Sequence, residues 1–232
     1  MVDINRHKFF LLQLLKDIYS DPLLANSLGF KGGTALMFFY DLPRFSVDLD
    51  FDLLATEQEE MVFQKVHKIV LKHGSVFDKA RKYYGLIIVL DYGFGERKLK
   101  VEISKRPFDN HYEIKELLGF NVRVMSLPDM FAHKLCALTD RGTTINRDIF
   151  DTWFFLQRKT PVNRDIVESR MKMPFEEYIE KCITQLGSLK NRWMLDGLGE
   201  LVDPAMKHFV RTKLLSEMIS LLEIFKEYPL FS

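Results

Sequence analysis

The chain has 232 residues, of which 47% are apolar and 28% are charged, and its formal net charge is +1. This composition is typical of a globular protein with a sizeable core and excludes a disordered chain. The nearly neutral charge excludes a global basic field, so nucleic-acid binding would need a local basic patch. There is no signal-peptide pattern and no run of eighteen apolar residues, so we expect a cytoplasmic protein that does not use the membrane as a partner.

The first half of the sequence carries alternating helix and strand signals. A broad apolar face predicts a helix over residues 5–19, and GGTALMFFYDL (32–42) predicts a glycine turn that leads into a short helix. Strict alternation predicts a strand in FSVDLDFDLL (45–54). An acidic first turn and a basic, glycine-ended last turn predict a helix over 56–74. Four more period-two segments follow, with a hairpin turn at YGFGE between two of them: VFDKARKYY, LIIVLDY, RKLKVEIS and FNVRVMSL.

From Ser126 onward the pattern is helical almost without interruption. SLPDMFAHKLCALTDRG begins with a serine cap and has Gly142 just past its expected end. Three further helical segments follow: NRDIFDTWFFLQRK, PFEEYIEKCITQL and AMKHFVRTKLLSEMISLLEIFKEY. The sequence therefore predicts an α+β fold, with an α/β unit over residues 1–125 and a helical unit over 126–232.

Three aspartates alternate with apolar residues in the predicted strand over residues 45–54. Alternate residues of a strand share a face and lie about 6.5 Å apart, so Asp48, Asp50 and Asp52 point the same way. Two carboxylates at this separation repel each other by about 2.5 kcal/mol at an effective dielectric near 20. A divalent cation with a preference for hard oxygen ligands would reverse that penalty. The plain alternative is an exposed strand end with solvated acids.

The glycine turn before this strand favours the functional interpretation. Backbone N–H groups at a turn that opens a helix bind phosphate, and Gly32, Gly33 and Thr34 form such a turn. A phosphate cradle beside a carboxylate pair is what metal-assisted nucleotidyl transfer needs. A lone Gly-Gly would be weak evidence, since it is usually only a turn.

These residues resemble the signature of the DNA polymerase beta-type nucleotidyltransferase superfamily. More narrowly, KGGTAL…YDLPRFSVDLDF and HKLCALTDRG…RDIFDTWFFL resemble the AbiEii/AbiGii-type toxins of type IV toxin–antitoxin and phage-abortive systems, over about residues 28–160. The resemblance implies a nucleotidyltransferase-type mixed sheet flanked by helices. It also implies transfer of NMP from an NTP to a hydroxyl, with a tRNA 3′ end as acceptor and a cognate antitoxin as partner.

The resemblance also implies roles for individual residues. Asp48 and Asp50 would hold two Mg²⁺ ions (Mn²⁺ being possible), with a third carboxylate from a later strand, for which Glu102 is preferred over Asp91. Asp50 and Asp52 also fit the carboxylate pattern, but the preceding Arg44-Phe45-Ser46 aligns Asp48 and Asp50 with the family. The residues expected to bind the nucleotide are Lys31, Gly32, Gly33, Thr34, Arg44, Ser46 and Lys134.

The family carries a lysine and an aspartate on consecutive helices, and Lys134 and Asp148 fit this description. Lys134 interrupts an apolar helix stripe, where a triphosphate would supply its counter-charge. The alternatives are a snorkelling side chain for Lys134 and a helix cap for Asp148. Asp151, one turn further on, is a weaker candidate for the same role.

Basic residues on the later strands are candidates for an RNA track. Such clusters are as often solvated strand edges. The residues are Lys79, Arg81, Arg97, Lys98, Lys100 and Lys105. Two other functions stay open at this point: transfer to a small molecule or protein side chain, and a non-catalytic module that binds RNA or protein.

Overall fold

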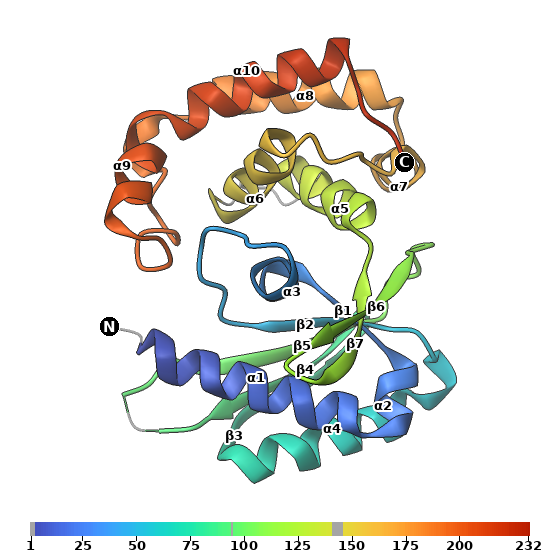
Figure 1. Cartoon of the computed structure of the whole chain (residues 1–232). Coiled ribbons are helices and arrows are strands. Elements are labelled where there is room, and N and C mark those ends of the chain that lie inside the picture. Colours follow the sequence, from blue (N-terminus) through green and yellow to red (C-terminus); the bar gives the residue numbers. More distant parts are fainter. Residues whose placement is uncertain (1–2, 94, 141–145) are drawn as a thin grey trace. The chain divides into compact units, whose positions relative to one another are not determined.

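The structure is a computed structural model that describes residues 3–93, 95–140 and 146–232. The chain divides into two compact units, Met1–Met125 and Ser126–Ser232. The first is an α/β unit and the second is helical (Figure 1).

A seven-stranded mixed sheet forms the centre of the first unit, with the strand order β3-β4-β5-β2-β1-β7-β6. The pairs β2–β5 and β1–β7 are parallel, and the other neighbours are antiparallel. The strands are β1 (Leu28–Lys31), β2 (Leu49–Leu53), β3 (Ser75–Lys82), β4 (Gly85–Asp91), β5 (Leu99–Ser104), β6 (Tyr112–Leu117) and β7 (Phe120–Met125).

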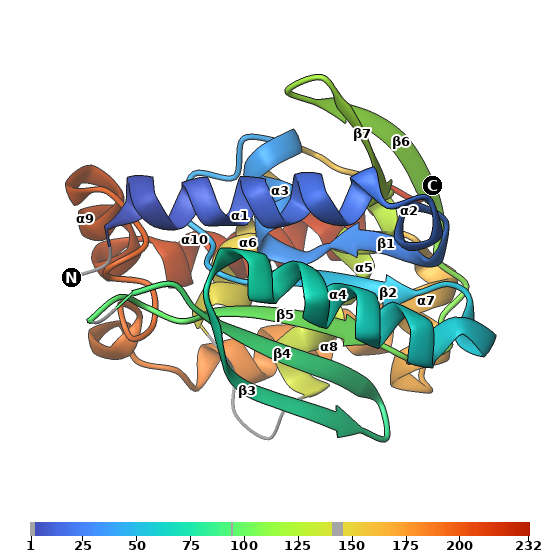
Figure 2. The same cartoon turned by 90° about the horizontal axis from the view of Figure 1, so that it is seen from below.

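Helices cover the two faces of this sheet unequally. On one face lie α1 (Ile4–Ser20), α2 (Pro22–Ser27) and α4 (Glu59–His73), the last preceded by a 3₁₀ turn, η1 (Thr56–Gln58). The short helix α3 (Gly32–Phe39) lies on the other face (Figures 1 and 2). Fully buried leucines of α1 lie where this helix packs against α4 and β7, which explains why its sequence has a strong helical period.

The second unit is built from helices around an aromatic core. The Phe131 ring stacks on Phe155 with centroids 5.0 Å apart, and the buried Tyr178 hydroxyl donates to the Leu135 carbonyl oxygen at 2.8 Å. Its elements are α5 (Leu127–Asp140), α6 (Asn146–Gln157), α7 (Arg164–Met171), α8 (Phe175–Gly187), η2 (Asn191–Trp193), α9 (Pro204–Thr212) and α10 (Leu214–Glu227). In the part of the chain that the structure describes, no helix has both the length and the apolar character needed to cross a membrane.

The predicted α+β class is confirmed, and the differences are local. The strand expected over 45–54 is shorter, since β2 begins at Leu49 and Asp48 directly precedes it. The single helix expected over 205–228 is two helices, α9 and α10, which are separated at Lys213. The sequence patterns missed β1, β6, α2 and α7. Gly142 lies outside the described residues.

Candidate active site

Strand pairing brings the predicted carboxylates together. Asp50 lies opposite Glu102 on the parallel strand β5, and opposite Lys31 on the antiparallel strand β1. Paired residues of neighbouring strands point to the same face, so the Asp50 and Glu102 side chains are neighbours. Asp48, two residues before Asp50, joins them at the start of β2. The structure therefore groups Asp48, Asp50 and Glu102, and we call this group the acid cluster.

A single lysine neutralises part of the acid cluster. The Lys100 Nζ lies 2.6 Å from Glu102 Oε2 and 3.9 Å from Asp48 Oδ2. The pKa of Asp50 is raised to about 6, mainly by burial and then by the charges of Asp48 and Glu102, while Lys100 and Lys31 oppose this rise. Burial alone would lower the pKa of Lys100, but its hydrogen bond to Glu102 and the nearby carboxylates raise it overall. Among the contacts described for this site, the three carboxylates outnumber the two lysines, Lys100 and Lys31, that act on them, so the site attracts more positive charge.

The two glycines of the turn pack directly against predicted site residues. Gly32 has a φ of +80°, and a Cβ there would lie 2.5 Å from Asp50 Oδ2. A Cβ on Gly33 would lie 2.7 Å from both Arg44 Nη2 and Ser46 Oγ. Any larger residue would therefore displace the carboxylate or the guanidinium, so the turn and the acid cluster form one site.

Thr34 and Arg44 form hydrogen bonds to backbone carbonyl groups close to the turn. The Thr34 side chain is fully buried, and its hydroxyl donates to the Asp48 carbonyl oxygen at 2.5 Å. This bond fixes the backbone beside the first carboxylate, so only the Thr34 backbone remains for a phosphate. The buried Arg44 donates through Nη1 to the Phe45 carbonyl oxygen at 3.0 Å, with its Nη2 beside Gly33.

Asp52 has a different environment from Asp50, although the two lie on the same strand. Asp52 is 4% exposed, and its Oδ1 accepts from the Lys31 Nζ at 2.5 Å. Its Oδ2 accepts from the Tyr112 hydroxyl at 2.7 Å and from Asn110 Nδ2 at 3.1 Å. Asp52 is thus a buried, satisfied anion that links β1, β2 and β6, and Lys31, expected at the nucleotide, is its counter-ion.

Asp91, the alternative third carboxylate, lies away from the acid cluster in strand register. It ends β4 opposite Ser75, forms an ion pair with Lys98 and accepts from the Gly93 N–H at 3.1 Å. These two contacts lower its pKa. Glu102, and not Asp91, is the carboxylate beside Asp50.

The second unit carries a lysine held by two acids. The Lys134 Nζ lies 3.0 Å from Asp148 Oδ1 and 2.8 Å from Asp151 Oδ2, and both aspartates are buried. Asp151, which the sequence patterns ranked below Asp148, makes the shorter contact. Residues three apart on a helix share a face, and this spacing is the signal that pairs the two acids.

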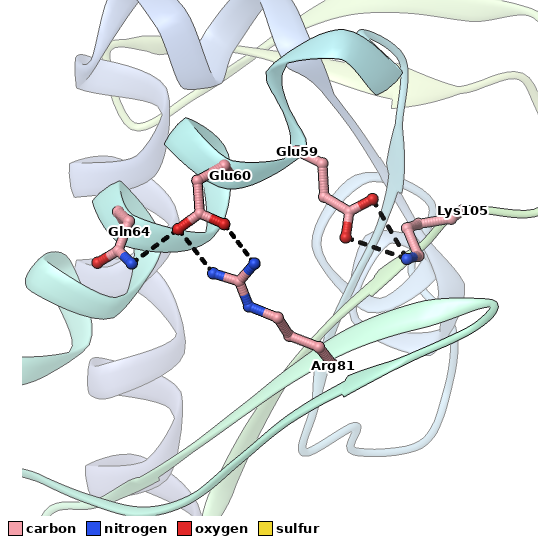
Figure 3. A network of polar contacts seen from close by, with 5 residues as sticks. All are labelled: Glu59, Glu60, Gln64, Arg81 and Lys105. Atoms are coloured by element: carbon pink, nitrogen blue, oxygen red, sulfur yellow. Dashed lines mark hydrogen bonds and ion pairs between the residues drawn. The ribbon is translucent and has the colours of Figure 1, made fainter.

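Most residues of the expected RNA track are paired with acids. Arg81 binds both oxygens of Glu60, and Lys105 binds Glu59 with Nζ 3.0 Å from Oε1 (Figure 3). Lys98 and Lys100 are held by Asp91 and Glu102 as described above. The structure also shows what the patterns missed: Lys100 acts as a cation of the acid cluster, for which its position two residues before Glu102 was the available signal.

The acid cluster has the donor chemistry of a Mg²⁺ site. Within residues 3–93, 95–140 and 146–232, no three acid, histidine or cysteine side chains already surround a common metal position. Lys100 lies between Glu102 and Asp48, where it takes the charge-neutralising role that a metal would fill. The oxygen-only donors, their mutual repulsion and the Asp50 oxygen beside Gly32 fit a hard divalent cation.

Comparison with known proteins identifies the family of this chain. The family model for the nucleotidyl transferase AbiEii toxin, type IV TA system, matches residues 13–212. None of the curated proteins compared matches this chain significantly.

Two solved structures from Helicobacter pylori share the fold. One is JHP933, with a TM-score of 0.63 and 20% identity over 97% of this chain and 92% of that chain. The other, named only as a presumed nucleotidyltransferase, has a TM-score of 0.65 and 20% identity, covering 97% of this chain and 95% of that chain. Because the family model matches residues 13–212, most of the chain, this protein belongs to the AbiEii family of nucleotidyltransferase toxins and is a nucleotidyltransferase.

Proposed function

We propose that this toxin transfers NMP from an Mg²⁺-bound NTP to the 3′ hydroxyl of a tRNA in the cytoplasm, and that a cognate antitoxin restrains it. The observation that carries the proposal is the acid cluster, in which Asp48, Asp50 and Glu102 share one lysine beside a glycine turn. The family description supports the transferase and toxin roles. The metal, the acceptor and the antitoxin are inferences from site chemistry and the family resemblance.

Asp48 and Asp50 would hold two Mg²⁺ ions, or Mn²⁺, and Glu102 would hold one of them. When bound, these ions would neutralise the triphosphate and make the acceptor hydroxyl more acidic. Burial raises the pKa of Asp50 most, and the repulsion from Asp48 and Glu102 that adds to this rise would be replaced by attraction to the metal ions. Lys100 would release Glu102, because one carboxylate oxygen cannot serve both partners fully.

The reaction is an in-line displacement at the α-phosphorus. The acceptor oxygen forms a bond to the α-phosphorus as the bond from that phosphorus to the bridging α,β-oxygen breaks, and pyrophosphate leaves. Glu102 accepts the hydroxyl proton and passes it to solvent. Its place at the edge of the acid cluster, partly exposed, suits this role.

Backbone N–H groups of the glycine turn would hold the β- and γ-phosphates. Gly32, Gly33 and Thr34 begin α3, so their N–H groups lie at the positive end of the helix. Arg44 beside Gly33 adds a fixed positive charge under the turn, and Ser46 lies next to it. In the second unit, Asp148 and Asp151 fix the ammonium of Lys134, the lysine that the family resemblance assigns to the nucleotide.

A transfer assay tests the proposal. The protein is incubated with each labelled NTP, Mg²⁺ and total tRNA, in parallel with Asp48→Ala and the matched control Asp91→Ala. We expect labelled tRNA from the wild type and from Asp91→Ala but not from Asp48→Ala, and no label when EDTA replaces Mg²⁺. If the wild type labels nothing that Asp48→Ala fails to label, the proposed reaction is wrong. Label on protein or on a small molecule, and never on RNA, would overturn the tRNA acceptor alone.

A further inference from the structure

The two outer strands, β3 and β4, continue the face of the sheet that carries the acid cluster. Ile87 of β4 lies directly opposite Glu102, and Ala80 of β3 lies directly opposite Ile87. One row of side chains therefore runs from Asp50 through Glu102 and Ile87 to Ala80 at the sheet edge. With neighbouring strands about 4.8 Å apart, this row extends about 10 Å beyond Glu102.

The burial of β4 shows that its two faces have different environments. Leu86, Ile88 and Leu90 are at most 1% exposed, and Arg81, which is paired with Leu86, reaches the Phe63 ring of α4. These residues therefore face the helices. Ile87 and Val89 point to the opposite face, the face of the acid cluster, where they are only half-buried. An apolar strip thus borders the carboxylate that we assign to the acceptor hydroxyl.

Exposed aromatic rings stand at the end of this strip, in the turn between β3 and β4. Tyr83 is 84% exposed and Tyr84 is 56% exposed, and their rings meet edge to face with centroids 4.6 Å apart. The Arg106 guanidinium lies 5.5 Å from the centroid of the Tyr84 ring. Large exposed rings beside a guanidinium are the groups on which unpaired bases stack.

The basic residues beside these rings differ in their ion pairing from the other basic residues nearby. Arg81 and Lys105 are neutralised by acids of α4 (Figure 3). In the described part of the chain, neither Lys82 nor Arg106 has an ion-pair partner, and both are exposed. Lys82 lies opposite Gly85 on the acid-cluster face. Asp78, which is also on this face, lies four residues earlier in β3, away from the tyrosines. The end of the strip nearest the tyrosines therefore favours an anion.

We propose that this surface, made of Ile87, Val89, Tyr83, Tyr84, Lys82 and Arg106, binds the single-stranded 3′ end of the RNA acceptor. The terminal nucleotide lies over Ile87 with its hydroxyl at Glu102, and preceding bases stack on the tyrosines while Lys82 and Arg106 contact phosphates. The inference rests on the proposed function, because it takes RNA as the acceptor. It adds which strands hold the acceptor and that the recognised element is unpaired.

Direct RNA binding tests this surface apart from catalysis. The probes are a short single-stranded RNA with a free 3′ hydroxyl and a blunt-ended RNA hairpin of the same length. Tyr83→Ala/Tyr84→Ala is compared with Tyr228→Ala, which removes a tyrosine of similar exposure (78%) from the second unit. Binding of Mg²⁺–NTP is measured in parallel by calorimetry, and thermal melting checks each fold.

We expect the double variant to weaken single-strand binding by about tenfold to a hundredfold, and Tyr228→Ala to leave it unchanged. Lys82→Ala should also lower the slope of log K against log salt by about 0.7, as loss of one phosphate contact to a single strand does. Mg²⁺–NTP binding should be unaffected in all three variants.

Three results would overturn the inference. These are equal RNA affinity for the double variant and wild type, equal affinity of the wild type for single strand and hairpin, and no RNA binding by a wild type that still binds Mg²⁺–NTP. The last would leave the nucleotide half of the proposed function standing. Tyrosine-dependent RNA binding without any Mg²⁺–NTP binding would do the reverse, supporting this surface while removing the proposed reaction.

Discussion

Asp50 and Asp52 occupy the same face of one strand, yet they have opposite electrostatic environments. Asp50 is surrounded by Asp48 and Glu102, which share a single lysine, and its pKa is raised to about 6. Asp52 has Lys31 on one oxygen and two hydrogen-bond donors on the other. The first is a group of charges that needs a further cation, and the second is complete within the protein.

This difference teaches that spacing defines where a carboxylate points but not what it does. A buried charge with all its partners holds elements together, and a buried charge without enough partners is a source of binding energy. In this protein Asp52 is of the first kind and Asp50 of the second, and only Phe51 lies between them. Substitutions should therefore affect activity at one position and stability at the other.

The largest effect is expected from Asp50→Asn on nucleotidyl transfer. Losing one charge of the acid cluster should lower the rate by about a thousandfold, or about 4 kcal/mol in activation free energy. The same change should raise the free energy of unfolding of the metal-free protein by about 1 kcal/mol, because it removes like-charge repulsion. Rates and urea unfolding measure the two effects, with the exposed Asp109→Asn as control. A metal-free protein that Asp50→Asn destabilises would contradict the comparison.

Asp52→Ala should act mainly on stability. The change leaves Lys31 without its counter-ion in a partly buried position and removes the acceptor of Tyr112 and Asn110, so we expect a loss of about 3 kcal/mol in the free energy of unfolding. Urea unfolding measures this loss. The double variant Lys31→Met/Asp52→Leu should recover much of it, since no unpaired charge remains. A loss under about 1 kcal/mol would mean that Asp52 is not a structural anion.

The sequence was sufficient to place the acid cluster but not to separate its neighbours. Alternation predicted the shared face of Asp48, Asp50 and Asp52, because period two is a local property of a strand, and the family resemblance supplied Glu102 from a later strand. Lys31 on β1 lies 21 positions from Asp52, but the partners Asn110 and Tyr112 are about sixty positions away, before and on β6. That strand is an edge strand with charged and exposed residues, so no apolar period reveals it.

The turn and the helices show the same limit. The glycine turn was predictable from GGT, but the contact of Gly32 with Asp50 depends on the β1–β2 register. The break between α9 and α10 falls at Lys213, where the apolar pattern continues through both helices. Signals within one element were sufficient for the fold class, and pairings between elements decided which acids are satisfied.

Lys100→Met should increase the metal affinity of the acid cluster that contains Asp50, and so sharpen its difference from Asp52. Lys100 is the protein's own cation for the acid cluster, so its removal should tighten Mn²⁺ or Mg²⁺ binding by about tenfold, or about 1.4 kcal/mol. Calorimetry with the metal alone, without nucleotide, measures this. Lys98→Met, which frees Asp91, is the matched control and should change metal affinity little. Weaker metal binding in Lys100→Met would show that Lys100 organises the carboxylates more than it competes with the metal.

The smallest effect concerns His7, a buried polar group that is satisfied while neutral. Its ring nitrogens contact the Tyr92 hydroxyl at 2.6 Å and the Val47 carbonyl oxygen, next to Asp48, at 2.8 Å. Burial lowers the pKa of His7 below 6.5, and the bond to Val47 offsets this only in part. Below pH 6.5 the unfolded chain binds a proton that the folded protein resists, so stability is lost as the pH falls from 6.5 toward the lowered pKa. We expect the free energy of unfolding to fall by about 1 kcal/mol between pH 7 and pH 5, seen as a lower urea midpoint.

His7→Gln keeps polar atoms but cannot titrate, so the difference between wild type and variant isolates the effect of this residue from that of the carboxylates. An identical pH dependence in both proteins would mean that folding does not oppose the protonation of His7, which would contradict the lowered pKa.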